Sequence, residues 1–477
     1  MRVKRRCGKG GRIGRMVAPA VVTALCAVAT LPGGASADEA TGAGAGGATG
    51  GGSGGAYAFA DGIKPITGAA TTSDAPRLDA GAVYRDAITG GAKRIYRLDL
   101  DAKTNAYVSA VAVPEADSTV DRSDSLKVSL QDRNGFNCSA NDARFGSADF
   151  ARPVAAYAHR TMNRDSSFCQ DAGPYYVVVE RDSKATSSPE AWDLEIRHEL
   201  EPKLKTEGPT AAPEEWASAS PPAPAGGPRE RAGGTSFFDA TGLTEGEWTD
   251  RIEPGRSRFY RVPVNWGQQL FASADLGSSS GNGFVGSALA VTLFNPVQGV
   301  VSSSDSVSYD GKQKSAALEP LPPVKYENRF DSGSKFVNTR FAGWYYLRVS
   351  LNPEVGEEFG RKPYGLTLRI NVEGTPAAAP AYDGQAGIFA VTEADQEAAA
   401  NGQSGPEAAK SGTMRLVAAA GIGAGSVLVL GLVAWTLLAR RSAARAASAT
   451  GAGAGAGTGA AAATETGPTR YGPPAAW

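Results

Sequence analysis

The chain has 477 residues, and its 48 Lys and Arg residues nearly balance 49 Asp and Glu residues, so the formal net charge is -1. This balance argues against nucleic acid as a partner, because nucleic acid recognition needs clustered positive charge. A chain of this length would hold about three domains, but many of its 60 glycines lie in low-complexity patches, so we expect two folded domains.

The N-terminal segment, residues 1–37, has the pattern of a secretory signal peptide. Seven Lys and Arg residues come before a mostly apolar run, Met16–Leu31, and residues 35–37 (Ala-Ser-Ala) provide a small-x-small cleavage site. Cleavage before Asp38 would remove these seven positive charges and lower the formal net charge from -1 to -8. A lipoprotein signal with Cys26 as the acceptor is the alternative, but Leu25 is larger than the residue such signals need there.

The segment after the signal changes from low complexity to an all-β pattern. Residues 38–56 are mostly Gly, Ala, Ser and Thr and predict a flexible leader. Residues 57–200 contain short alternating apolar runs separated by turn residues. Apolar and charged side chains alternate over residues 96–101, and the apolar run Tyr175–Val179 is typical of a strand covered on both faces. We expect a first β-sandwich here.

Two cysteines, Cys138 and Cys169, remain once the signal is removed. In an oxidising compartment an isolated pair predicts one disulfide bond. A redox or metal-binding pair is the alternative, and His159 lies between the two cysteines in the sequence. Three ligands without a fourth make a poor zinc site, so we expect the disulfide.

The strand pattern of residues 57–200 returns over residues 236–373. Four blocks recur in the same order, which predicts two jelly-roll-like β-sandwich domains in tandem. The matched blocks are Asp86 with Arg94–Leu98 and Asp250 with Arg258–Val262, then Leu126–Leu130 and Leu289–Leu293, Gly173–Val179 and Gly343–Val349, and Trp192–Ile196 and Tyr364–Leu368.

In these blocks the chain resembles the bacterial pre-peptidase C-terminal (PPC-like) domain family. The Tyr-bearing early strand with its turn (Arg258–Gly267), the Gly-x-Tyr-Tyr-x-x-Val strand and the final Tyr-x-Leu-x-Leu strand carry this resemblance, which covers residues 57–200 and 236–373. It implies jelly-roll-like sandwiches that act as non-catalytic modules attached to secreted hydrolases or surface proteins. This chain departs from that pattern because it has no hydrolase domain, which leaves the role of the modules open.

Two further segments are expected to be flexible. Residues 201–235 contain seven prolines, which predict an extended, semi-rigid spacer, so the two domains need not touch. Residues 374–415 are rich in Ala, Gly, Gln and Glu and predict a flexible stalk, within which a short helix over residues 391–400 is compatible with the sequence.

Residues 416–439 carry no ionisable group and predict one transmembrane α-helix. At about 1.5 Å per residue this run is longer than a hydrocarbon core of roughly 30 Å. Arg440, Arg441 and Arg445 follow it, so the positive-inside rule predicts a type I cell-membrane protein with its N-terminus and bulk outside the cell. Residues 440–477 predict a disordered cytoplasmic tail.

Candidate chemical sites are few. The chain has two histidines, His159 and His198, and no nucleophile-elbow motif, so we expect no enzymatic activity and no catalytic residues. Asp117, Asp121 and Asp124 form an acidic loop that does not follow the EF-hand pattern. We expect a solvated loop and no metal or other cofactor, with calcium binding at this loop as the alternative.

Aromatic residues of the second repeat are candidates for ligand contacts. Trp266, Trp344 and Tyr345, together with Tyr346, would form a platform on which sugar rings stack if they were exposed. Such residues more often fill the core of a sandwich, and that alternative stays open at this point.

These patterns together predict a non-catalytic, single-pass surface protein. Its two extracellular sandwiches would serve adhesion, assembly or presentation to an extracellular protein, and the Gly and Ala bias suggests an actinobacterial-type, thick-walled cell. One alternative is an accessory membrane subunit of a separately encoded protease or secretion system. Another is a protein that binds wall glycan.

Overall fold

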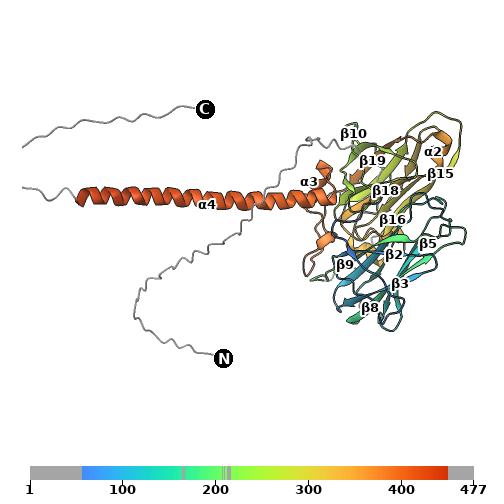
Figure 1. Ribbon diagram of the computed structural model, residues 1–477, viewed down its shortest axis with the longest axis horizontal. Coiled ribbons are helices and arrows are strands. Elements are labelled where there is room, and N and C mark those ends of the chain that lie inside the picture. Colours follow the sequence, from blue (N-terminus) through green and yellow to red (C-terminus); the bar gives the residue numbers. More distant parts are fainter. Residues whose placement is uncertain (1–55, 164–166, 207, 209, 212–215, 450–477) are drawn as a thin grey trace, which may run out of the picture. The chain divides into compact units, whose positions relative to one another are not determined.

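The computed structural model describes residues 56–163, 167–206, 208, 210–211 and 216–449, with side chains except at 414–426 and 442–449 (Figure 1). The predicted signal peptide (1–37), all but the last residue of the predicted leader (38–56) and the predicted tail from residue 450 lie outside the described residues.

The first sandwich is formed by two sheets with the strand orders β1-β2-β9-β4-β7 and β3-β8-β5-β6. Within these sheets only the short β1 pairs in parallel with its neighbour, and the other pairs are antiparallel. The strands are β1 (Lys64–Pro65), β2 (Val83–Ile88), β3 (Lys93–Leu100), β4 (Asn105–Val113), β5 (Ser125–Asp132), β6 (Asn137–Arg144), β7 (Val154–Arg160), β8 (Gly173–Asp182) and β9 (Trp192–Glu201).

The second sandwich has the sheet orders β10-β12-β19-β14-β17 and β11-β13-β18-β15-β16. Its strands are β10 (Pro228–Glu230), β11 (Thr241–Gly242), β12 (Gly246–Ile252), β13 (Ser257–Val264), β14 (Gln269–Leu276), β15 (Val285–Phe294), β16 (Val300–Tyr309), β17 (Lys314–Ala317), β18 (Gly343–Leu351) and β19 (Tyr364–Glu373). The helices are η1 (Tyr326–Phe330), α1 (Ser334–Val337), α2 (Glu354–Phe359), η2 (Gly387–Phe389), α3 (Glu393–Asn401) and α4 (Gly405–Ala449).

The all-β prediction is confirmed, and the sheet orders of the two sandwiches correspond strand for strand apart from the extra β11. The blocks that recur in the sequence form one buried arrangement in each sandwich. The Tyr96 hydroxyl donates to the Asp86 carboxylate over 2.7 Å, and the Tyr260 hydroxyl donates to Asp250 over 2.6 Å. Since both tyrosines are fully buried, these carboxylates satisfy hydroxyl groups that water cannot reach.

The two sandwiches pack directly against each other, so the prediction that they need not touch is wrong. Val111 and Ala155, on the outer face of β4 and β7, pack with Phe237, Phe259 and Phe294 of the second sandwich. Hydrogen bonds cross the same junction: Ser109 Oγ lies 2.7 Å from Gln298 Oε1, and the Tyr157 hydroxyl donates to Asn338 Oδ1 over 2.5 Å.

The partner face on the second sandwich differs from its counterpart on the first. Ala290 and Phe294 of β15 are buried. In the matched block of β5, Lys127 and Gln131 take these positions, and Lys127 forms a surface ion pair with Glu180 at 3.4 Å. The equivalent face of the first sandwich is therefore polar at these two positions.

The carboxylate of Glu201 lies at the centre of this junction and is fully buried at the end of β9. It forms an ion pair with Arg329 of η1, whose Nη2 lies 2.8 Å from Oε1. It also accepts hydrogen bonds from Asn105 Nδ2 (2.7 Å), the Tyr107 hydroxyl (2.8 Å) and the Tyr382 hydroxyl (2.8 Å). Burial raises the pKa of Glu201, but Arg329 and these hydrogen bonds outweigh burial and hold the pKa below its usual range.

The segment between the second sandwich and α4 is packed rather than flexible, which corrects the predicted stalk over residues 374–415. We call residues 374–403 the strap. Tyr382 donates to Glu201, and Phe389 packs with Tyr107 and Phe341 at the junction. The strap then forms α3, which confirms the short helix considered over residues 391–400.

Helix α3 is fixed to the second sandwich from several sides. Thr392 and Asp395 form a capping box at its start, and the Trp344 indole donates to Asp395 Oδ1 over 2.9 Å. The Gln403 carbonyl, just after α3, accepts hydrogen bonds from the Gly242 amide (3.2 Å) and Arg261 Nη2 (3.0 Å). Since α4 begins at Gly405, the sandwiches are held close to the start of α4.

Among the described residues, no helix combines the length and the apolar character needed to cross a membrane. The predicted span 416–439 falls within α4, and the side chains of its first part, up to residue 426, lie outside those described.

We predict that Glu201→Gln weakens the folded chain by about 3 to 5 kcal/mol at neutral pH, because the buried Arg329 guanidinium would lose its counter-charge. The pKa of Glu201 is lower in the folded than in the unfolded chain. The contribution of Glu201 to the free energy of unfolding is therefore complete above its unfolded-state pKa of about 4.3. This contribution is lost as the pH falls through the lower folded-state pKa. Urea unfolding at pH 7 and pH 3 measures both effects.

The control for this prediction is Glu180→Gln, which breaks the exposed Lys127–Glu180 pair and should cost about 0 to 1 kcal/mol. A loss for Glu201→Gln that is equally large at both pH values would contradict this account of the junction.

Candidate functional site at the disulfide-bonded loops

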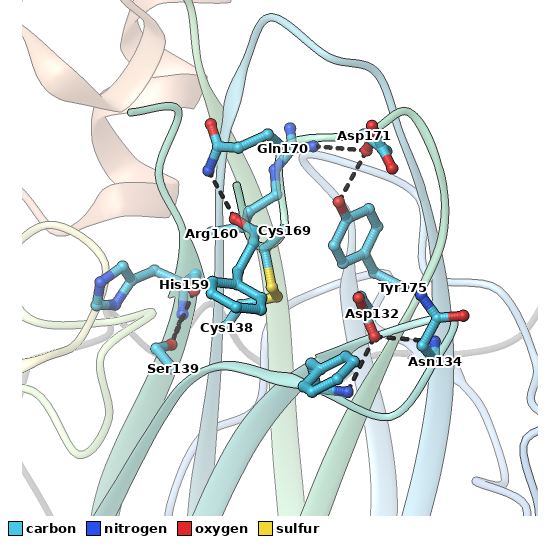
Figure 2. The surroundings of a disulfide bond; sticks show 12 residues. Asp132, Asn134, Cys138, Ser139, His159, Arg160, Cys169, Gln170, Asp171 and Tyr175 are labelled. Carbon is cyan, nitrogen blue, oxygen red and sulfur yellow. Dashed lines mark hydrogen bonds between the residues drawn. A yellow bond between two sulfur atoms is a disulfide. The ribbon is translucent and has the colours of Figure 1, made fainter. Parts of the chain in front are cut away.

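The predicted disulfide between Cys138 and Cys169 is confirmed, with the two Cα atoms 5.7 Å apart. Cys138 lies in β6, and Cys169 lies in the connection between β7 and β8, so the bond joins a strand to the loop beside it (Figure 2). Cys169 has a φ of 58°, in the left-handed region that a non-glycine residue rarely adopts.

The turn between β5 and β6 is shaped by its own side chains. Asp132 Oδ1 accepts a hydrogen bond from the backbone amide of Asn134 over 2.8 Å (Figure 2). It also accepts one from the backbone amide of Phe136 over 2.9 Å. Gly135 has a φ of 85°, a conformation that glycine adopts without a steric cost. The turn therefore presents the Phe136 side chain in a defined position.

The loop that carries Cys169 is held in a similar way. The Gln170 side chain donates to the Phe168 carbonyl over 2.9 Å. The Tyr175 hydroxyl donates to the Asp171 carbonyl over 2.7 Å (Figure 2). Tyr175 is buried in the core of the sandwich, so this loop is connected to a rigid element.

These two loops place two exposed phenylalanine rings next to each other. Phe136 is 56% exposed, Phe168 is 62% exposed, and their ring centroids lie 5.8 Å apart. We call this pair the aromatic rim. It borders a small depression of about 140 Å³ whose lining includes Asp132, Arg133, Asn134 and Asp171. Exposed apolar rings beside polar groups are typical of surfaces that bind a partner, because burying the rings is favourable and the polar groups fix orientation.

The sequence analysis did not select Phe136 or Phe168. Both phenylalanines flank the cysteines, since Phe136 comes two residues before Cys138 and Phe168 directly precedes Cys169. A large apolar residue close to each cysteine of the predicted disulfide was the sequence feature that could have identified this pair.

The aromatic residues predicted as ligand-facing lie elsewhere, which corrects that prediction. Trp266 and Tyr345 are buried in the core, and the Tyr345 hydroxyl donates to the Phe341 carbonyl over 2.8 Å. Trp344 is half-buried under α3, with the Arg261 guanidinium 4.0 Å from its ring centroid. Since β18 lies between β13 and β15 in its sheet, its side chains meet the core on one face and the junction or α3 on the other.

Neither histidine is arranged for nucleophilic catalysis among the described residues. His198 is buried, its Nδ1 lies 3.3 Å from the Leu78 carbonyl oxygen, and burial lowers its pKa to about 4. The His159 ring is stacked near Tyr107 and Tyr157, and burial lowers its pKa well below the usual range. Ser139 exchanges hydrogen bonds with the backbone of His159 rather than with its imidazole (Figure 2).

The acidic loop uses most of its carboxylates to hold its own backbone. Asp121 accepts hydrogen bonds from the Ser123 amide and hydroxyl, and the fully buried Asp124 accepts from the Lys184 amide over 2.8 Å. In the part of the chain that the structure describes, no group of three His, Cys, Asp or Glu side chains is placed to hold a metal ion.

Comparisons with known proteins give no family for this chain. No protein-family model matches it, and no curated protein matches it. Among solved structures, the CBM22-1-CBM22-2 tandem domain of Paenibacillus barcinonensis Xyn10C matches with 12% identity over 67% of this chain and 100% of that chain, at a TM-score of 0.17.

Two other solved structures match at a similar level. Broad bean stain virus matches with 9% identity over 68% of this chain and 98% of that chain, at a TM-score of 0.17. Tripeptidyl peptidase 2 matches with 8% identity over 62% of this chain and 24% of that chain, at a TM-score of 0.19. TM-scores this low carry no argument about the function of this chain.

We predict that the double variant Cys138→Ala/Cys169→Ala loses about 3 to 4 kcal/mol of folding free energy in the chain-entropy model, because the bond closes a loop with a sequence separation of 31. Reduction of the native chain should cause the same loss, measured by urea unfolding with and without reductant. Thiol labelling of either cysteine before reduction would contradict the bond itself.

Proposed function

We propose that this chain is a non-catalytic, single-pass surface protein that binds an extracellular protein through the aromatic rim of its first sandwich. The observation that carries this proposal is the Phe136–Phe168 pair, which is more than half exposed although a disulfide joins the segments on either side of it. A rigid apolar contact loses little conformational entropy on binding, which favours a recognition role. The likeness of the repeats to PPC-like modules, and their origin by duplication, are part of this proposal.

The membrane anchor in this proposal is the span 416–439. Its support is the absence of ionisable residues from the span and the exposure of its large apolar side chains from Val427 to Leu438, among them Trp435 at 73%. Such a surface is unfavourable in water and favourable in lipid. The three arginines that follow the span favour an orientation with the sandwiches outside the cell.

A second candidate function is that of an accessory subunit in a membrane complex. The strap favours this candidate because it packs against both the Glu201 network and the second sandwich and ends next to the start of α4. Modules fixed close to a membrane helix are better placed to contact a neighbouring membrane protein than a target beyond a thick wall.

We predict that the full chain stays in the membrane fraction after extraction with alkaline carbonate, because the apolar span would be buried in lipid. The variant truncated after Lys410 should move to the soluble fraction. Recovery of the full chain in the soluble fraction would overturn the proposed anchor.

The proposed binding function is tested by site-specific photo-crosslinking on intact cells. A photo-reactive phenylalanine analogue at position 136 should give a discrete protein adduct, and Phe168→Ser should abolish that adduct because the second ring is lost. Phe284 of the second sandwich, 67% exposed, is the matched control position. Equal adducts at positions 136 and 284, or an adduct that glycan-degrading enzymes remove, would contradict a protein partner at the aromatic rim.

A further inference from the structure

A second cavity lies between the two sandwiches, apart from the aromatic rim. This junction groove has a volume of about 820 Å³, and its lining includes Tyr57, Phe59, Arg85, Arg152, Arg256 and Ser257. The volume is in the range of about 300 to 1,000 Å³ that small-molecule sites occupy, and such sites are common at domain interfaces. Residues of both sandwiches line the groove, so a ligand bound there would contact both.

The groove wall includes a buried arginine without a carboxylate partner. Arg152 is 5% exposed. Its Nη2 donates to the Phe145 carbonyl over 2.7 Å and its Nη1 to the carbonyls of Ala148 and Phe150, while its buried Nε has no hydrogen-bond partner. These hydrogen bonds are all to neutral oxygens, and the charges of Asp305 and Asp149 offset only part of the cost of burying the guanidinium. Burial accordingly lowers the pKa of Arg152 to about 10.

A second buried arginine increases this excess of positive charge. Arg348 is 4% exposed, donates to the carbonyl of Pro153 in the groove wall and to Thr292 Oγ1, and leaves its Nε without a partner. Burial first, and then the charge of Arg152, lower the pKa of Arg348, and the charge of Asp305 offsets part of this shift. Among the described residues, neither Arg152 nor Arg348 forms an ion pair within 4.0 Å.

The remaining charges of the groove lie mostly at its exposed rim. Arg85 is bound by Asp193 over 2.9 Å and covers the Phe59 ring at 4.2 Å. Glu115 and Glu190 are exposed, so water screens their charge. Arg256 lines the groove and forms no side-chain hydrogen bond or ion pair within the described part of the chain. Arg256 is therefore the groove-lining arginine that has no partner among the described residues, and it shares the wall with apolar surface.

The apolar part of the wall suits a hydrophobic ligand body. Tyr57 and Phe59 contact each other edge to face at 5.1 Å, and Ala151, Pro153 and Val113 continue the apolar surface. An apolar body would bury this surface, while a carboxylate would pair with Arg256.

We propose that the junction groove binds an apolar carboxylate, either a free organic acid or the C-terminus of a peptide, through Arg256. The ring or aliphatic part of this ligand packs on Phe59 and Pro153. This site is independent of the aromatic rim, and each can fail without the other.

The test uses the full chain in detergent and 3-phenylpropionate as the probe, with 3-phenylpropionamide as the uncharged analogue, in isothermal titration calorimetry. The acid should bind saturably and at least tenfold more tightly than the amide. Arg256→Gln should weaken binding of the acid at least tenfold, whereas Arg251→Gln, an exposed arginine outside the groove lining, should not. Arg256 is chosen because Arg152 supports local backbone and its loss would disturb folding.

A second arm separates the two sources of the carboxylate. The peptide acetyl-Ala-Phe with a free C-terminus is compared with 3-phenylpropionate. Tighter binding of the peptide assigns the site to peptide C-termini, and tighter binding of the small acid assigns it to organic acids. Equal binding of acid and amide, an unchanged affinity of Arg256→Gln, or no saturable binding of either acid would overturn the proposal.

Discussion

The buried carboxylate of Glu201 is the contact on which the arrangement of this molecule depends. It joins the end of β9 in the first sandwich, Arg329 of the second sandwich and Tyr382 of the strap. Burying an ion pair is costly, and the cost is offset only when every oxygen is hydrogen-bonded, which the contacts from Asn105 and Tyr107 help to achieve. Three segments distant in the sequence must therefore meet in one place, because separation of any one would leave a charged or polar group unpaired.

The two proposed sites differ in whether they depend on the junction that this network stabilises. The aromatic rim belongs to the first sandwich alone and is shaped by the disulfide and local turns, so it needs no contribution from the second sandwich. The junction groove is lined by residues of both sandwiches, so it requires their contact. The aromatic rim therefore needs only the first sandwich, whereas the junction groove needs both sandwiches.

Sequence patterns predicted the elements of this fold better than their contacts. Alternation and the recurring blocks predicted the sandwiches, and the isolated cysteine pair predicted the disulfide. The junction was missed because proline-rich and Ala-rich composition predicted flexible segments, whereas a few residues such as Tyr382 and Phe389 pack the strap against the junction. Trp266 and Tyr345 were ambiguous because periodicity does not reveal whether both faces of a strand are covered. The first repeat has Lys127 where the second repeat has Ala290. This difference was the sequence feature that could have indicated a docking face on the second sandwich.

The most direct test of this account is differential scanning calorimetry of the full chain in detergent at neutral pH. If the sandwiches and the strap form one body, both sandwiches should unfold in one transition whose calorimetric and van't Hoff enthalpies agree. Two well-separated transitions would show that the sandwiches unfold independently and would contradict the central role of the Glu201 network.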